Sequence, residues 1–167
     1  MVWACISHNQ KGPLIRFDMV PEIMNEKGKK KGGGLDGSKY VKQVLQGPLK
    51  DFVADMKVEQ GLNILVLEDG APSHHRKVTA KTQSELGLEQ IKHPPDSPDL
   101  NLIKPLWNVL KNCVTDIPGS CNSLDKLWAA CQQVWDGITV DKINTHTGRM
   151  DDCVAAVKAA KGFHTRF

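Results

Sequence analysis

The sequence predicts a mixed α/β domain in which helices pack on a sheet. Two short apolar runs open the chain, at residues 1–7 and 13–18. After them, segments of strand length and of helix length alternate to residue 114, and further helical segments follow. The alternation behind an N-terminal hairpin is the observation that selects this class over an all-α or all-β fold.

The first segment is predicted to be a β-hairpin or the edge of a meander, because the turn sequence HNQKG separates its two apolar runs. Residues 25–38 (NEKGKKKGGGLDGS) hold four lysines and five glycines and are predicted to form a mobile loop. Such a loop can touch a phosphate backbone, or it can be an ordinary solvated surface.

The middle of the chain is predicted to form helix, strand, helix and strand in turn. Apolar residues recur at helical spacing from 38 to 60, with a kink or break expected at Gly47-Pro48 and an end at Gly61. The run LNILVLED is predicted to be a strand buried on both faces. A polar helix follows, with Val78, Thr82 and Leu86 on one face, and residues 88–93 form a short strand.

The last third is predicted to be helical. A helix at 97–114 carries an apolar stripe formed by Leu102, Leu106, Trp107, Leu110 and Val114. Asp99 or Asn101 is expected to cap it. Helices at about 124–135 and 140–161 follow, the second ending at Gly162.

Composition limits the class of protein. The 167 residues are 40% hydrophobic and 25% charged with a net charge of +3, which is compatible with nucleic acid but also with many enzymes. Five cysteines without a C-x-x-C pair argue against a disulfide framework or a zinc site, so we expect a nuclear or cytoplasmic protein with reduced thiols. No apolar run reaches membrane-spanning length, and the opening residues are interpreted as a strand and not a secretion leader.

Two groups of residues could carry chemistry. Glu68 and Asp69 end the predicted buried strand, where an acid can ligate a hard cation such as Mg²⁺ or can simply cap the following turn. His74 and His75 could bind metal, but adjacent residues on a helix point in different directions, so surface histidines are the favoured interpretation.

The stretches LEDGAPSHHRK and HPPDSPDLNLIKPLWNVLK resemble the catalytic domain of mariner-type DDE transposases. That family has an Asp followed by Asn-Ala-Pro-x-His, and later Ser-Pro-Asp-Leu-Asn-Pro-Ile-Glu. The resemblance extends over essentially the whole chain and implies an RNase H-like α/β fold, a mixed sheet with flanking helices. We assign residues 1–118 to a partial catalytic core and 119–167 to a C-terminal helical extension of the same domain.

The resemblance places Asp69 at the family's second catalytic acid and Lys104 at its third, with the family's own interval of 34 residues between them. Gly70, Leu102 and Pro105 also depart from the family pattern. We expect the first acid, its strand and a helix-turn-helix region to belong upstream of Met1, so that the sheet lacks its first, acid-bearing strand.

The family's Mg²⁺-dependent chemistry uses two metal ions about 4 Å apart, held by three carboxylates. Lys104 brings a positive charge to that position, which opposes cation binding. We therefore expect Asp69 to be the one remaining metal ligand, no bound Mg²⁺ and no activity, and Lys104→Glu alone not to restore cleavage. Lys104 either forms an ion pair with Asp69 or extends outward while Asp69 caps its turn.

The leading hypothesis is a remnant of a DDE transposase catalytic domain, acting in its ancestors on transposon-end DNA and now inactive. The alternative is a non-enzymatic module that binds DNA or another transposase copy; a third is a fragment without function. The expected partners are DNA, bound weakly, and other copies of the chain through exposed strand edges. The candidate DNA-binding residues are Lys27, Lys29, Lys30, Lys31 and His74.

Overall fold

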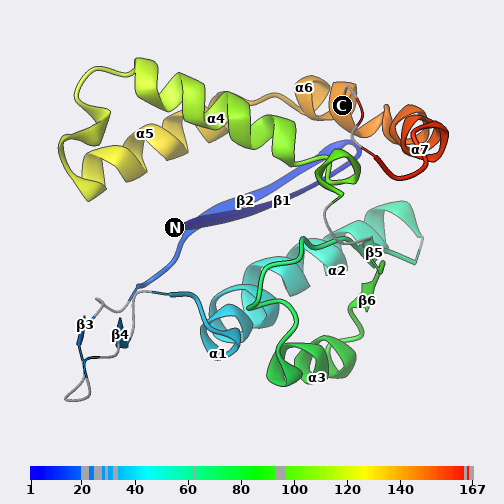
Figure 1. The fold of residues 1–167 in the computed structure, drawn as a ribbon, viewed down its shortest axis with the longest axis horizontal. Helices are drawn as coiled ribbons and strands as arrows, with labels where there is room; N and C mark the ends of the chain where they lie inside the picture. The colour runs from blue at the N-terminus through cyan, green and yellow to red at the C-terminus, as the bar shows by residue number, and fades with distance from the viewer. Residues whose placement is uncertain are drawn as a thin grey trace. The chain divides into compact units, whose positions relative to one another are not determined.

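The computed structural model divides the chain into two compact units (Figure 1). Unit 1 comprises Met1–Trp3 and Ile15–Pro95, and unit 2 comprises Ala4–Leu14 and Asp96–Phe167. The structure describes residues 1–19, 23–24, 28, 30–31, 34–61, 63–92, 97–163 and 165.

The predicted N-terminal hairpin is confirmed. Strand β1 (Val2–Ser7) pairs with β2 (Gln10–Arg16), and a turn at residues 8–9 joins them. Asn9 has φ 67°, a left-handed conformation that asparagine tolerates better than most residues. The turn is shorter than predicted, because β2 already begins at Gln10. The base of the hairpin belongs to unit 1 and its tip to unit 2.

The predicted long helix of unit 1 is present as three consecutive stretches, α1 (Gly37–Tyr40), η1 (Val41–Leu49) and α2 (Lys50–Gln60). The helix is not broken at Pro48. Instead η1 is a π-helix, whose wider turn accommodates a proline that lacks an amide and crowds the preceding turn. Gly61, at φ 62°, ends the helix as predicted.

The strands of unit 1 are shorter than predicted. β5 (Leu65–Val66) pairs in parallel with β6 (Glu89–Gln90), and β3 (Ile23–Met24) pairs antiparallel with β4 (Lys30–Lys31). The prediction of a long strand buried on both faces is wrong, since only two residues are strand and Leu65 is 51% exposed. Among the described residues β5 has one partner, and each sheet has two strands, so no continuous mixed sheet is seen there.

Helix α3 (Lys77–Glu85) buries a face that matches the predicted one in part. Thr82 is buried as predicted and Leu86 packs against the core, but Val78 is 42% exposed, and Thr79 and Gln83 are buried as well. Polar side chains can occupy this position because they find partners: the Thr79 hydroxyl donates to Ser73 O at 2.7 Å, and Gln83 donates to Glu68 at 2.7 Å. The core of unit 1 consists of Phe17, Tyr40, Val41, Val44, Leu45, Leu49, Val53 and Leu88.

Unit 2 contains the helices η2 (Pro98–Leu100), α4 (Lys104–Asp116), η3 (Ser120–Asn122), α5 (Leu124–Gly137), α6 (Val140–Thr147) and α7 (Met150–Ala159). Helix α4 begins seven residues later than predicted, because residues 98–100 form a 3₁₀ helix and residues 102–103 a turn instead of α-helix. The predicted final helix is divided into two at residues 148–149.

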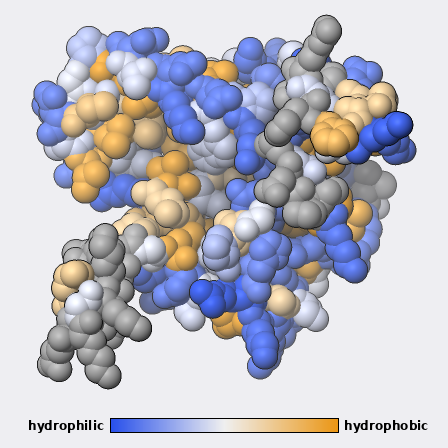
Figure 2. Space-filling view, in the orientation of Figure 1, coloured by the Kyte–Doolittle hydropathy of each residue, from blue (hydrophilic) through white to orange (hydrophobic). Residues whose placement is uncertain are grey.

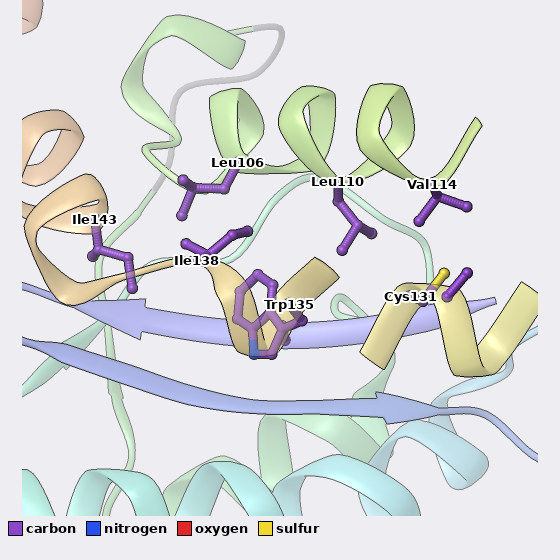
Figure 3. Packing of buried hydrophobic residues seen from close by; sticks show 9 residues of the cluster. Leu106, Leu110, Val114, Cys131, Trp135, Ile138 and Ile143 are labelled. Atoms are coloured by element: carbon purple, nitrogen blue, oxygen red, sulfur yellow. The ribbon is translucent and has the colours of Figure 1, made fainter. Parts of the chain in front are cut away.

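The apolar stripe of α4 faces α5 and the hairpin, as its spacing predicts (Figure 3). Leu106, Leu110 and Val114 are at most 5% exposed and pack with Cys131 and Trp135 of α5. The Trp135 indole donates to Gly12 O at 3.1 Å, which ties α5 to the tip of the hairpin. Trp107 and Trp135 also stack, with ring centroids 5.9 Å apart.

The visible surface is mainly hydrophilic, with hydrophobic residues in separate groups (Figure 2). Val58 and Leu124 are 85% and 78% exposed. None of the described helices has the length and apolar character that crossing a bilayer requires.

Candidate functional site

Asp69 lies three residues after Val66, the last residue of β5, in the segment that leaves the carboxyl end of that strand. Its Oδ1 accepts the backbone N–H of Ala71 at 3.1 Å, so the carboxylate caps the turn that follows. The side chain is 45% exposed. Of the two roles predicted for Asp69, the turn-capping contact is therefore present in the structure.

His74 packs onto Asp69 and not into solvent. Its Nδ1 is 3.0 Å from Asp69 Oδ1 and 3.1 Å from Asp69 O, and its side chain is 13% exposed. The imidazole also contacts the Tyr40 ring, with centroids 4.5 Å apart and planes tilted by 45°. The prediction of a solvated surface side chain is wrong for His74, because the turn at residues 72–75 directs it inward, and holds for His75, which is exposed.

Glu68 is the acceptor at the centre of a polar network. The Tyr40 hydroxyl donates to Oε1, and the amide groups of Gln83 and Gln90 donate to Oε2. Tyr40 is fully buried, and burial together with the neighbouring Glu68 charge raises the pKa of its hydroxyl far above the usual range. Both Glu68 oxygens are thus engaged by protein donors, which argues against the predicted role of Glu68 as a cation ligand.

The spacing of apolar residues does not reveal this network, because it identifies Tyr40 only as an apolar position of the helix. One signal was available: it is the single tyrosine of the chain, and a buried tyrosine requires a partner for its hydroxyl. The partner, 28 residues away, could not be identified without the fold.

The donor set in unit 1 does not fit a pair of divalent ions. Asp69 has a histidine and an amide at Oδ1, and the neighbouring Glu68 is fully engaged. Within the described ranges, no three His, Cys, Asp or Glu side chains are grouped so as to hold a metal ion. A two-metal site of the kind that cleaves phosphodiesters needs several carboxylate oxygens around each ion.

Lys104 is the first residue of α4, in unit 2, and its side chain is exposed. Its backbone N–H donates to Asn101 O at 3.0 Å, and this hydrogen bond closes the turn that precedes α4. Pro105 is the second helical residue, where no helical hydrogen bond is lost. Because Asp69 and Lys104 belong to different units, their ion pair stays a prediction.

The expected cap of α4 is not formed. No side chain caps the helix, and the prediction that Asp99 or Asn101 does so is wrong. Asp99 Oδ2 instead accepts the N–H and the hydroxyl of Thr165, at 3.1 and 2.6 Å. Asn101 is 8% exposed, and its carbonyl provides the backbone contact to Lys104.

Two of the four candidate DNA-binding lysines, Lys30 and Lys31, are among the described residues. Lys27 and Lys29 lie outside the described residues, and Lys30 and Lys31 are described only as the backbone of β4. The role of these lysines and of His74 in binding DNA stays a prediction.

The sequence matches the model of the DDE superfamily endonuclease family over residues 38–127, more than half of the chain, and the matched stretch contains Asp69 and Lys104. The whole chain is 25% identical to the Tcb2 transposase and 23% identical to the Tcb1 transposase of transposable elements of Caenorhabditis briggsae. It covers 54% of each, so the chain spans about half the length of these curated relatives.

The fold is similar to solved structures of the Mos1 mariner transposase. Its catalytic domain superposes with a TM-score of 0.69 at 17% identity, covering 83% of this chain and 69% of that one. The same domain has been solved with raltegravir and Mg at the same TM-score and identity. The Mos1 paired-end complex with the left transposon end superposes with a TM-score of 0.63 at 15% identity. These likenesses show the fold, a mixed α/β arrangement of the RNase H-like type.

Proposed function

Since the chain belongs to the DDE superfamily endonuclease family, we propose that it is a degenerate relative of Tc1/mariner transposase catalytic domains that no longer cuts DNA. The observation that carries the proposal is Lys104, the lysine at the third-acid position. The Ser-Pro-Asp-Leu-Asn element that leads to this position lies within residues 38–127, the stretch that matches the family, and this supports the assignment.

The electrostatic argument is simple. A carboxylate at this position attracts a divalent cation, whereas an ammonium group repels it, so the substitution removes a ligand and adds an opposing charge. At 4 Å two unit charges still interact by about 1 kcal/mol in bulk water and more near a protein surface. In metal-assisted cleavage the metal ions stabilise the attacking and leaving oxygens and so lower the activation barrier. Loss of the metal ions therefore removes most of the rate enhancement.

The contacts of Asp69 support the same proposal. Its Oδ1 is taken by the Ala71 amide and by His74, both within 3.1 Å. The catalytic domain of the Mos1 transposase, which has a similar fold, has been solved with Mg and with Mn. In this chain a metal ion at Asp69 would have to compete for Oδ1 with the Ala71 amide and His74.

Cleavage is tested with supercoiled plasmid and with linear duplex DNA in Mn²⁺ buffer, with an active family member as the positive control. The expected result is no nicking above the level of the Asp69→Ala variant. Metal-dependent nicking that disappears in Asp69→Ala would overturn the proposal. The side chain of Asp69 is 45% exposed, so Asp69→Ala leaves no large cavity in the core, and it removes the contacts to Ala71 and His74 together with the carboxylate.

The second candidate function is a non-enzymatic module that binds DNA or another transposase copy. The four lysines at 27–31 favour it, together with the transposon-end complex of the similar Mos1 transposase. DNA binding measured against salt tests it, since each phosphate contact contributes about 0.9 to the slope of log K against log salt. Replacing the four lysines by Gln lowers the slope by up to about four if they contact phosphates. Lys111→Gln, on the exposed surface of α4, is the matched control.

A further inference from the structure

The residues around Asp69 form a closed chain of contacts. Glu68 accepts the hydroxyl of Tyr40, the Tyr40 ring contacts the His74 ring, and His74 Nδ1 contacts Asp69 Oδ1. Glu68 and Asp69 are adjacent, so the chain of contacts starts and ends at the same strand end. Three separate parts of unit 1 contribute to it: helix α1, which holds Tyr40, the segment that follows β5, and the turn before α3.

The geometry assigns the tautomer of His74. Its Nδ1 faces two oxygens of Asp69, the carboxylate Oδ1 at 3.0 Å and the carbonyl O at 3.1 Å. Both oxygens can only accept hydrogen bonds, so Nδ1 must carry the proton. In the neutral ring Nε2 is then the unprotonated nitrogen.

We propose that His74 is a positioning residue for Asp69, and that Tyr40 positions His74 in turn. His74 holds Oδ1 toward the turn at Gly70-Ala71, where the Ala71 amide binds the same oxygen, and this leaves Oδ2 as the oxygen directed to any ligand. A carboxylate held at Oδ1 in this way can offer a ligand one oxygen, whereas a carboxylate that rotates freely can offer either oxygen or both.

Burial explains why Tyr40 can act as the anchor. It is fully buried within the core of unit 1, and its hydroxyl is fixed by Glu68, which the amides of Gln83 and Gln90 hold from the other side. A ring that cannot move provides a fixed surface for the imidazole. His74 is itself only 13% exposed, so few other orientations are open to it.

The inference rests on the assignment of Asp69 to the second-acid position in the proposed function. Its test, however, uses the full chain without DNA or metal. The positioning role can therefore fail while the proposed loss of cleavage stands, and cleavage can be found while the positioning role stands.

The first measurement is the nitrogen-15 spectrum of the histidine rings in mildly alkaline buffer. The expected result is a protonated Nδ1 and an unprotonated Nε2 for His74. The opposite tautomer overturns the proposal, and this result needs no variant that might fail to fold.

The second measurement is the Asp69 carboxyl carbon resonance in variants of His74. His74→Ala is expected to shift it, and His74→Asn to return it most of the way, because the Asn amide can donate where Nδ1 donated. A resonance that is unchanged in both variants, or one that His74→Asn does not return, overturns the proposal. The Trp135 indole N–H signal, which belongs to unit 2, checks that the rest of the chain is folded.

The third measurement separates the Tyr40 ring from its hydroxyl. Tyr40→Phe keeps the ring and is expected to keep the Nδ1–H tautomer, whereas Tyr40→Leu is expected to give a mixture of the two tautomers. An unchanged tautomer in a folded Tyr40→Leu variant overturns the role of Tyr40.

Discussion

Lys11 closes the end of helix α5 from a distant part of the chain. Its ammonium group, at the tip of the hairpin, donates to the carbonyl oxygens of Trp135, Asp136 and Ile138 at 2.9, 3.0 and 2.8 Å. The last carbonyls of a helix have no partner within the helix, and the helix dipole places negative charge there. The ammonium group neutralises the helix end and gives Asp136 O a partner. Trp135 O also accepts the Ile138 N–H at 3.1 Å, and Ile138 is the residue just past the helix.

Lys11→Met keeps the apolar stem and removes the charge. A cation at a partly buried helix C-terminus contributes up to about 2 kcal/mol, and a hydrogen bond to a charged group contributes about 1.5–3 kcal/mol. The contacts to Trp135 and Ile138 are part-buried and the contact to Asp136 is exposed. We therefore expect the substitution to lower the free energy of unfolding by about 2 kcal/mol, since the three bonds share one ammonium group and do not add.

The assay is urea unfolding followed by tryptophan fluorescence. Lys111→Met is the matched control, because Lys111 lies on the exposed surface of α4 in the same unit and surface substitutions of this kind change stability by less than about 0.5 kcal/mol. Equal midpoints for the two variants would refute the helix-end account of Lys11.

Three further predictions concern packing, pH and association. Gly12→Ala is expected to lower the free energy of unfolding by about 1–3 kcal/mol, because a Cβ would lie 2.7 Å from the backbone oxygen of Cys5; thermal melting checks it. Burial raises the pKa of the Cys5 thiol from 9.0 to about 12, so the stability that the neutral thiol contributes is complete below pH 9 and is lost as pH rises toward 12. Between these values the free energy of unfolding should fall by up to about 1.4 kcal/mol per pH unit, and the Cys5→Ala variant should show a smaller fall when its unfolding is measured against pH. Tyr40, whose pKa is also raised by burial, adds a further loss above about pH 10. Light scattering is expected to show that the chain self-associates as its concentration is raised, and that Leu65→Lys in strand β5, where Leu65 is exposed, reduces this association. A monodisperse monomer at all concentrations would count against this prediction.

How much of this could be predicted depends on the range of the interactions. The hairpin and the apolar stripe of α4 follow from local spacing, and Leu106, Leu110 and Val114 are buried as their spacing predicts. The assignment of Asp69 and Lys104 to the family's acid positions also uses short motifs at a fixed interval, and it stays a prediction. In each case the signal lies within a few consecutive residues, so the fold adds little to it.

The contacts between distant segments could not be predicted in this way. Lys11 reaches carbonyls more than 120 residues away, and Tyr40 reaches Glu68 across 28 residues. The buried polar face of α3 was missed because periodicity counts apolar residues, while Thr79 and Gln83 are buried through hydrogen bonds. Strand lengths were overestimated for a related reason: an apolar run shows what can be buried, but pairing partners decide what becomes strand.

The central claim, that this site has lost its metal, is tested most directly by thermal melting in a titration with Mn²⁺ or Mg²⁺. An ion that binds the native state must raise the melting temperature by mass action. The account predicts equal melting temperatures with and without the ion, in the native chain and in Asp69→Ala alike. A clear stabilisation in the millimolar range that disappears in Asp69→Ala would contradict it.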